Sequence, residues 1–195
     1  MQPAGRILAT EDEYLERERQ AETKSELING EIVAMAGGSP KHNALAANVA
    51  RVLGNRLLGR RCIVFNSDQR IHVPATGLYT YPDVSVACDG PKFHSKYKDT
   101  LLNPKVLIEV LSGSTEAYDR GAKFAHYRSI PSLEEYVLVW QDPMRVEHYK
   151  RIEPRQWLLT DHEGADASLQ VLGFDLPLHE LYAGLELLEE SAEES

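Results

Sequence analysis

The sequence of 195 residues is poor in several features that define common protein classes. It has only 2 cysteines, 3 methionines and 2 tryptophans, and no apolar run approaches the roughly 18 residues of a membrane span. Residues 1–6 contain no signal-like hydrophobic segment. We therefore expect a cytoplasmic protein without membrane contact. Its 43% hydrophobic and 26% charged residues are typical of a globular chain.

Common catalytic motifs are also missing. The sequence contains no GxxxxGK phosphate loop, no GxGxxG, no GxSxG nucleophile elbow, no HExxH helix and no CxxC pair. Their absence excludes the most frequent routes to nucleotide binding, serine hydrolysis, zinc proteolysis and redox chemistry. We expect no organic cofactor.

The two cysteines, Cys62 and Cys88, both lie among apolar and β-branched residues. Such surroundings are typical of small buried side chains. The sequence therefore predicts two buried reduced thiols rather than a disulfide or a metal site.

Charge is distributed unevenly along the chain. The whole sequence carries a net charge of −9, but residues 41–105 hold ten basic and four acidic residues, a net charge of +6. These ten residues could form one positive face for nucleic acid, or could simply keep separate surfaces soluble. The sequence leaves both interpretations open. The ten are Lys41, Arg51, Arg56, Arg60, Arg61, Arg70, Lys92, Lys96, Lys98 and Lys105.

Hydrophobic periodicity and turn residues predict a single α+β domain over residues 1–185, followed by an acidic, disordered tail over 186–195. Asn29-Gly30 indicates a tight hairpin turn, and Ser39-Pro40 indicates the start of a helix. The predicted helices cover about 10–21, 40–57 and 117–129. The predicted strands cover 26–28, 31–35, 62–66, 70–73, 83–88, 106–111, 135–140, 145–151, 156–160 and 168–172. Strands interspersed with helices favour a mixed sheet.

Two acidic residues lie where the predicted strands should be buried. Glu109 interrupts the apolar run Val106–Leu111, and Asp83 opens the next strand upstream. An unpaired buried carboxylate is costly, so a partner is expected. If the two strands pair, both carboxylates face one cleft and need a divalent cation or a lysine between them. Taken singly, Asp83 could be an ordinary turn residue and Glu109 part of a core salt bridge to arginine.

Several segments together resemble one known family. They are Tyr-Pro-Asp-Val-Ser-Val at 81–86, Ile-Glu-Val-Leu-Ser-Gly-Ser-Thr at 108–115, then Asp119, Lys123, Tyr127 and Glu-Tyr-Val-Leu-Val at 135–139. In order and spacing they resemble the Uma2 family of endonucleases, within the PD-(D/E)XK or restriction-endonuclease-like superfamily. The hairpin at 26–31 and the helix start at 38–42 resemble the same family. The likeness covers roughly residues 10–185.

The resemblance implies a restriction-endonuclease-like mixed central sheet flanked by helices, with an N-terminal hairpin. It also implies that Asp83 and Glu109, with the main-chain carbonyl of Val110, hold Mg²⁺, for which Mn²⁺ can substitute. The superfamily places a lysine two residues after the acid, whereas this chain has Leu111 there. In this family a lysine on the following helix takes that role, and Lys123 is the matching position. Gly113 and Trp140 are further departures, outside the proposed centre.

Other polar residues are candidates for accessory roles. Glu26, or Glu31 across the Asn29-Gly30 turn, could supply a further ligand or activate water, or the two could form a solvated hairpin pair. Asp119, Lys123 and Tyr127 share one helix face, although Asp119 and Lys123 could instead be a surface pair. His42 could shuttle a proton, but its place beside Leu45 and Val49 favours a core-edge histidine.

These residues predict a Mg²⁺-dependent endonuclease that hydrolyses DNA phosphodiester bonds. A chain this short needs a second copy to cut both strands, so a homodimer is expected. The alternative is a catalytically inactive nuclease-fold domain that binds nucleic acid or protein, which Leu111 and the net charge of −9 favour.

Overall fold

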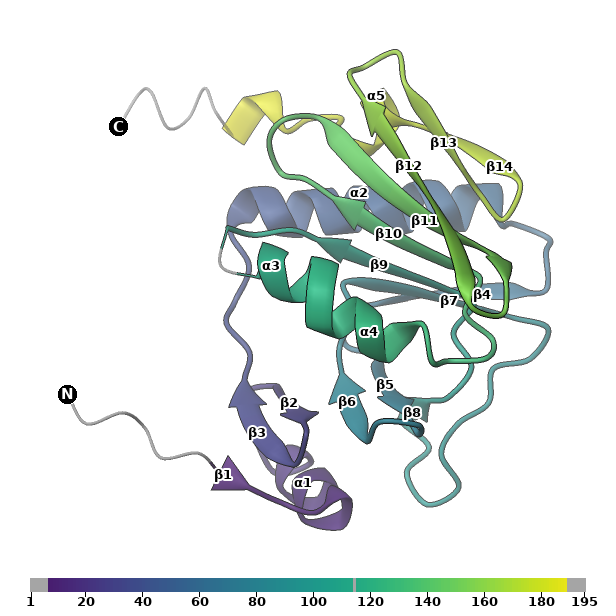
Figure 1. Ribbon diagram of the computed structural model, residues 1–195. Coiled ribbons are helices and arrows are strands. Elements are labelled where there is room, and N and C mark those ends of the chain that lie inside the picture. Colours follow the sequence, from purple (N-terminus) through teal and green to yellow (C-terminus); the bar gives the residue numbers. More distant parts are fainter. Residues whose placement is uncertain (1–6, 114, 189–195) are drawn as a thin grey trace.

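The computed structural model describes residues 7–113 and 115–188. Residues 1–6, where the sequence shows no signal-like segment, and residues 189–195, most of the predicted disordered tail, lie outside the described residues, as does Ser114. Figure 1 shows two large β-sheets, one above the other. No helix in the described part of the chain is both long and apolar enough to cross a membrane.

The main sheet has six strands in the order β12-β11-β10-β9-β7-β4. Its two central strands, β9 and β10, run parallel, and the remaining neighbours are antiparallel, so the sheet is mixed as predicted. The β10–β11 hairpin is also confirmed. The strands are β4 (Cys62–Asn66), β7 (Val84–Cys88), β9 (Val106–Val110), β10 (Glu135–Val139), β11 (Arg145–Glu153) and β12 (Gln156–Glu163).

The second sheet has the order β1-β3-β2-β6-β5-β8. The predicted hairpin joins it, with Ile28 opposite Glu31 across the turn, and both turn residues adopt positive φ as expected for Asn-Gly. Helix α1 (Glu11–Glu18) follows a capping box at Thr10. The strands are β1 (Ile7–Leu8), β2 (Ser25–Ile28), β3 (Glu31–Ala34), β5 (Arg70–Val73), β6 (Leu78–Thr80) and β8 (Thr100–Leu101).

Helices cover both faces of the main sheet (Figure 1). Helix α2 (Pro40–Arg56) packs on one face, against Val106, Ile108 and Val110 of β9. A smaller hairpin of β13 (Ser168–Val171) and β14 (Phe174–Pro177), with α5 (Leu178–Leu181), completes that layer. Because alternate residues of a strand point to opposite faces, Leu107, Glu109 and Leu111 face the other way.

The helix on that opposite face is irregular. It begins as α3 (Glu116–Tyr118), widens into a π-helical turn over Asp119–Lys123 and ends as α4 (Phe124–Tyr127). A π-turn inside a helix is rare and often marks a functional site. The helix stops shortly before Pro131, as predicted for the residues preceding a proline.

The prediction for the cysteines is wrong. Strands β4 and β7 pair so that Cys62 lies directly opposite Cys88, with a Cα–Cα distance of 4.0 Å, and the two form a disulfide. Both residues are half-buried rather than fully buried. The apolar neighbours of each cysteine correctly indicated partial burial. The pairing itself depends on a contact between two strands whose cysteines are 26 residues apart in the sequence.

Candidate active site

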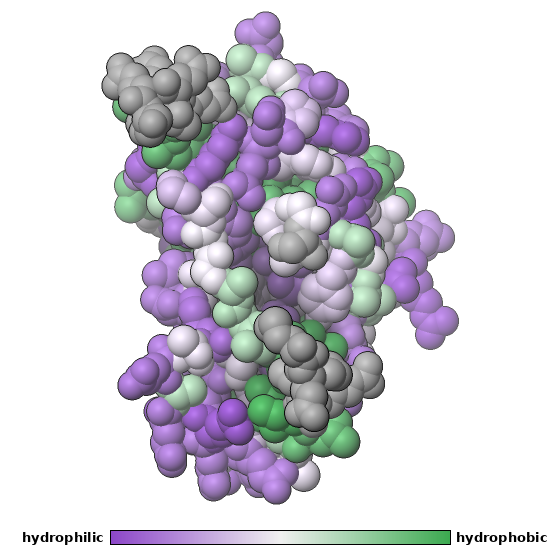
Figure 2. All heavy atoms as spheres, turned by 90° about the vertical axis from the view of Figure 1, so that its left-hand side faces the viewer, coloured by the Kyte–Doolittle hydropathy of each residue, from purple (hydrophilic) through white to green (hydrophobic). Residues whose placement is uncertain are grey.

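A cavity of about 690 Å³ lies where the two sheets meet the amino-terminal end of α2 and the start of the irregular helix. In Figure 2 this region is a hollow across the middle of the molecule, with hydrophilic residues at its base. Seven of the nine predicted site residues line it. They are Glu26, His42, Asp83, Glu109, Val110, Asp119 and Lys123, whereas Glu31 and Tyr127 do not line it.

Asp83 and Glu109 lie side by side because their strands pair. Antiparallel β7 and β9 place Val84 opposite Ile108, so Asp83, one residue before β7, lies next to Glu109. The Val110 amide donates a hydrogen bond of 2.7 Å to Asp83 Oδ2. The structure thus shows a role for the Val110 amide in fixing Asp83, while the predicted role of its carbonyl as a metal ligand stays a prediction.

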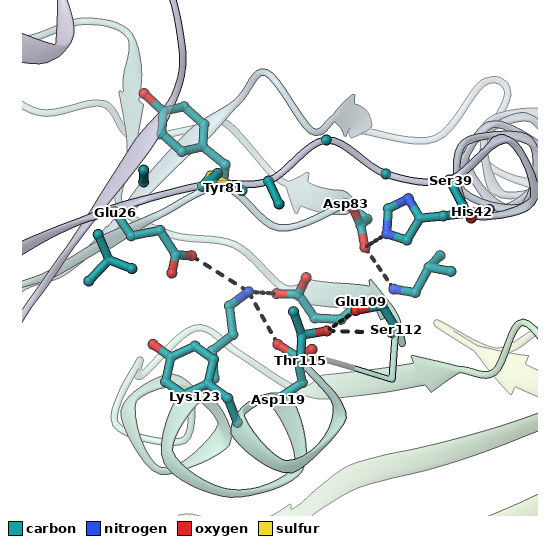
Figure 3. A pocket seen from close by; sticks show the side chains of 18 of the residues that line it. Glu26, Ser39, His42, Tyr81, Asp83, Glu109, Ser112, Thr115, Asp119 and Lys123 are labelled. Atoms are coloured by element: carbon teal, nitrogen blue, oxygen red, sulfur yellow. Dashed lines mark hydrogen bonds and ion pairs between the residues drawn. The ribbon is translucent and has the colours of Figure 1, made fainter. Parts of the chain in front are cut away.

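Lys123 reaches Glu109 from the opposite helix. Its Nζ lies 2.9 Å from Glu109 Oε1, 3.4 Å from Asp119 Oδ1 and 3.7 Å from Glu26 Oε1. Figure 3 shows the ammonium group at the centre of these three carboxylates. Lys123 is only 6% exposed, so the alternative of a solvated Asp119–Lys123 surface pair is excluded. The helix supplies a cation to the acidic strand, where Leu111 cannot.

Two hydroxyl groups donate hydrogen bonds to the carboxylates of Glu109 and Glu26. The Tyr127 hydroxyl donates to Glu109 Oε1 at 2.7 Å, and the Thr80 hydroxyl donates a short hydrogen bond to Glu26 Oε1. Glu26 projects from β2 into the cavity (Figure 3). Tyr127 does not line the cavity, so it positions Glu109 through its hydrogen bond. Thr80 lies on a strand of three residues that the sequence pattern did not predict.

Four carboxylates share this site with a single buried ammonium group. Burial, together with the charges of Asp119 and Asp83, raises the pKa of Glu109 to about 8 despite the opposing effect of Lys123. Burial also raises the pKa of Asp119. The surrounding carboxylates hold the pKa of Lys123 well above its usual range despite its burial. Lys123 therefore stays charged, whereas burial works against the charged forms of Glu109 and Asp119.

His42 belongs to the site, although its sequence position favoured a core-edge role. It lies in the first turn of α2, which Ser39 caps by accepting a hydrogen bond from the His42 amide. Its Nε2 lies 3.2 Å from Asp83 Oδ2. This hydrogen bond raises the pKa of His42 above its ordinary value. His42 and Val110 together hold one oxygen of Asp83 from two sides.

Sequence reasoning missed several residues of the cavity wall. Residues 33–38, which form the end of β3 and the segment leading to α2, make one side. Tyr118 lies on the irregular helix, and Gln141 bridges Ser39 and the Leu111 carbonyl. The sequence offered no signal for them, since none is an acid, a histidine or a lysine in an unusual setting.

The donor set suits a hard divalent cation. Asp83 and Glu109 present carboxylate oxygens from adjacent strands. Within each of these two carboxylates, contacts with the described residues involve one oxygen, Oδ2 of Asp83 and Oε1 of Glu109. Mg²⁺ binds through one or two carboxylates plus waters rather than through a full protein cage. Among residues 7–113 and 115–188, no group of three or more His, Cys, Asp or Glu side chains is arranged to hold a metal ion by itself.

The ten basic residues of segment 41–105 do not gather at the cavity. None of them lines it, and Lys123 is the single lysine or arginine among the described residues that do. Several are instead paired with acidic residues elsewhere, as in Arg56–Glu180, Arg70–Asp99, Lys96–Asp12 and Lys105–Glu134. The fold thus uses much of this charge to join its own elements.

Comparison with solved structures supports the fold. A crystal structure described as a putative nuclease belonging to DUF820, from Anabaena variabilis, superposes with a TM-score of 0.73. It shares 22% sequence identity, and the match covers 89% of this chain and 97% of that one. At this identity the likeness concerns the fold, which is therefore the predicted restriction-endonuclease-like α+β architecture.

Sequence comparisons identify the family. Two uncharacterized Synechocystis proteins are similar, sll1609 with 43% identity over 84% of this chain and 92% of its own length, and slr1290 with 37% identity over 89% and 91%. The model of the Uma2 family, described as "Putative restriction endonuclease", matches residues 11–179. The resemblance inferred from the motifs is confirmed: the chain belongs to the Uma2 family of restriction-endonuclease-like nucleases.

Proposed function

We propose that this protein is a Mg²⁺-dependent endonuclease that hydrolyses DNA phosphodiester bonds at the Asp83–Glu109–Lys123 site. The observation that carries the proposal is the 2.9 Å contact between Lys123 and Glu109. It brings an acid pair and a lysine together although the strand itself lacks that lysine. Two carboxylates that can hold a metal ion and a cation that can stabilise charge on the phosphate are groups that metal-dependent phosphodiester hydrolysis can use.

Asp83 and Glu109, with the Val110 carbonyl, would hold the ion, and Mn²⁺ would be an acceptable substitute. When bound, the ion lowers the pKa of a coordinated water and offsets charge on the phosphate. Lys123 places a positive charge at the same point, where it stabilises negative charge that develops on the phosphate oxygens. His42 and the Val110 amide keep Asp83 in position.

Glu26 and Asp119 surround the same ammonium group. Of the two hairpin acids, Glu26 is the accessory candidate, because it lines the cavity and Glu31 does not. The carboxylates of Glu26 and Asp119 keep Lys123 charged and oriented toward Glu109. A homodimer would give one active site for each DNA strand, and this assembly is part of the proposal.

The test is nicking of supercoiled plasmid in Mg²⁺, with chelator as the first control. Wild-type protein should cut, and Asp83→Ala should not. Glu134→Ala is the matched control, because it removes an acid whose side chain is 54% exposed and paired with Lys105, outside the cavity. Cutting by Asp83→Ala at the wild-type rate would refute the proposed site.

A second candidate function is a binding domain of the nuclease fold without turnover. The ten basic residues of segment 41–105 are absent from the described cavity wall. Their absence favours this candidate, because DNA-cleaving surfaces usually carry several phosphate-binding cations. DNA binding that persists in Mg²⁺ without any strand cleavage would support this candidate.

A further inference from the structure

Tyr118 has a buried hydroxyl group for which the described residues supply no hydrogen-bond partner. The residue lines the cavity from α3, and its ring lies 5.9 Å from Lys123 Nζ. No atom of residues 7–113 and 115–188 forms a hydrogen bond with its buried hydroxyl oxygen. Burial raises the pKa of Tyr118, so the phenol keeps its proton and remains a hydrogen-bond donor.

The other tyrosines around the site differ in this respect. Tyr127 donates to Glu109, Tyr136 donates to the Asp119 carbonyl, and Tyr81 donates to Glu18. A buried hydroxyl without a protein partner gives the fold no benefit, and phenylalanine would fold at least as well. The hydroxyl of Tyr118 is therefore best explained by a ligand that enters the cavity.

Gly37, on another part of the same cavity wall, also lacks a reason within the protein. Its φ is not in the left-handed region, and a Cβ atom placed on it would meet nothing within 4 Å. The neighbouring Gly38 contrasts with it, because a Cβ there would come within 2.5 Å of His42 Nδ1. Glycine at 37 costs conformational entropy on folding and leaves open space beside the main chain at the cavity wall.

We propose that Tyr118 and Gly37 form the substrate-binding part of the cavity, an inference that rests on the proposed nuclease function. The Tyr118 hydroxyl donates a hydrogen bond to a non-bridging phosphate oxygen of the nucleic-acid backbone. Gly37 leaves room for that backbone to pass close to the protein main chain. A neutral donor suits this place, because the one buried ammonium group is already shared among three carboxylates.

The test measures binding and stability in the same variants. A fluorescein-labelled DNA hairpin is titrated in Ca²⁺, which permits binding without cleavage, and the KM for cleavage is measured in Mg²⁺. Tyr118→Phe should weaken binding about tenfold or more, the usual effect of losing a hydrogen bond to a charged group. Gly37→Val should weaken it by filling the space. Both variants should keep a Tm equal to or above that of the wild type.

Tyr182→Phe is the matched control. The Tyr182 hydroxyl donates to the Trp140 carbonyl and accepts from the Arg145 amide, and Tyr182 does not line the cavity. Its loss should lower Tm and leave DNA binding unchanged. Wild-type binding and KM in both Tyr118→Phe and Gly37→Val, or a lower Tm in Tyr118→Phe, would overturn this inference alone. A wild-type protein that neither binds nor cuts DNA would instead overturn the proposed function, and this inference with it.

Discussion

Lys123 Nζ lies 2.9 Å from Glu109 Oε1, although the lysine belongs to a helix and the glutamate to a strand of the main sheet. In the superfamily pattern the lysine comes from the same strand, at the position that Leu111 occupies here. The helix packs on the face of β9 from which Glu109 projects. The ammonium group of Lys123 therefore lies beside the Glu109 carboxylate although it comes from a different element (Figure 3).

The first prediction concerns the metal. Asp83→Ala or Glu109→Ala should weaken Mg²⁺ binding at least tenfold, because a single carboxylate holds this strongly hydrated ion poorly. Isothermal titration calorimetry checks it, with Glu134→Ala as the control. Unchanged affinity in both site variants would show that the ion binds elsewhere.

The second prediction uses the raised pKa of Glu109. A carboxyl group whose pKa is about 8 in the folded protein and near 4.5 in the unfolded chain lowers stability as pH rises between these values. Glu109→Gln cannot ionise, so without metal it should become more stable than the wild type by roughly 1 to 3 kcal/mol as pH rises from 5 to 8. Urea denaturation at several pH values measures this difference.

Glu134→Gln removes an exposed carboxylate and should show no such trend. A stability difference for Glu109→Gln that stays constant with pH would mean that Glu109 is already ionised throughout this range. The charge balance among the four carboxylates would then need revision.

The third prediction concerns His72, which is 6% exposed and has no hydrogen-bond partner for either ring nitrogen in the described part of the chain. Burial lowers its pKa, so the unfolded chain takes up a proton first and stability falls as pH drops below about 6.5. His72→Phe keeps the stacking on Tyr79. The variant should gain stability relative to the wild type at pH 5 and much less at pH 8, and equal shifts at both would contradict this.

The fourth prediction concerns the disulfide between Cys62 and Cys88. It closes a loop with a sequence separation of 26 residues, for which chain entropy gives about 3 to 4 kcal/mol of stabilisation. Cys62→Ser with Cys88→Ser should lower the free energy of unfolding by about that amount. The double variant should also be insensitive to reductant. Equal stability of wild-type protein with and without reductant would show that the bond contributes nothing.

The sequence predicted the charged residues that meet in the cavity better than it predicted the other residues of the cavity wall. Glu109 was recognisable because a carboxylate in an apolar strand needs a partner, and Asp83 because it opens a neighbouring strand. Lys123 followed from the family resemblance and from its spacing to Asp119. Those signals are local or depend on one strand pairing, which the structure confirms.

Other features depend on contacts that a single sequence does not encode locally. The disulfide requires the register of β4 against β7, and the role of His42 requires the end of α2 to lie beside Asp83. Short strands such as β6 and β8 are too brief for a hydrophobic period to reveal. In the sequence, Tyr118 resembles any aromatic residue of a helix, because the surroundings of its hydroxyl group depend on the three-dimensional structure.

The most direct test of the central claim, that the helix supplies the lysine of a metal-dependent site, is the plasmid-nicking rate of Lys123→Ala in saturating Mg²⁺. We predict a rate at least about 100-fold below the wild type, as for other losses of a group that stabilises transition-state charge, with Mg²⁺ affinity kept or tightened. Lys123→Arg should not restore the full rate, because a guanidinium differs in reach and hydration. Lys150→Ala, which removes an exposed lysine outside this cavity, should cut normally. Nicking by Lys123→Ala at the wild-type rate would contradict the account.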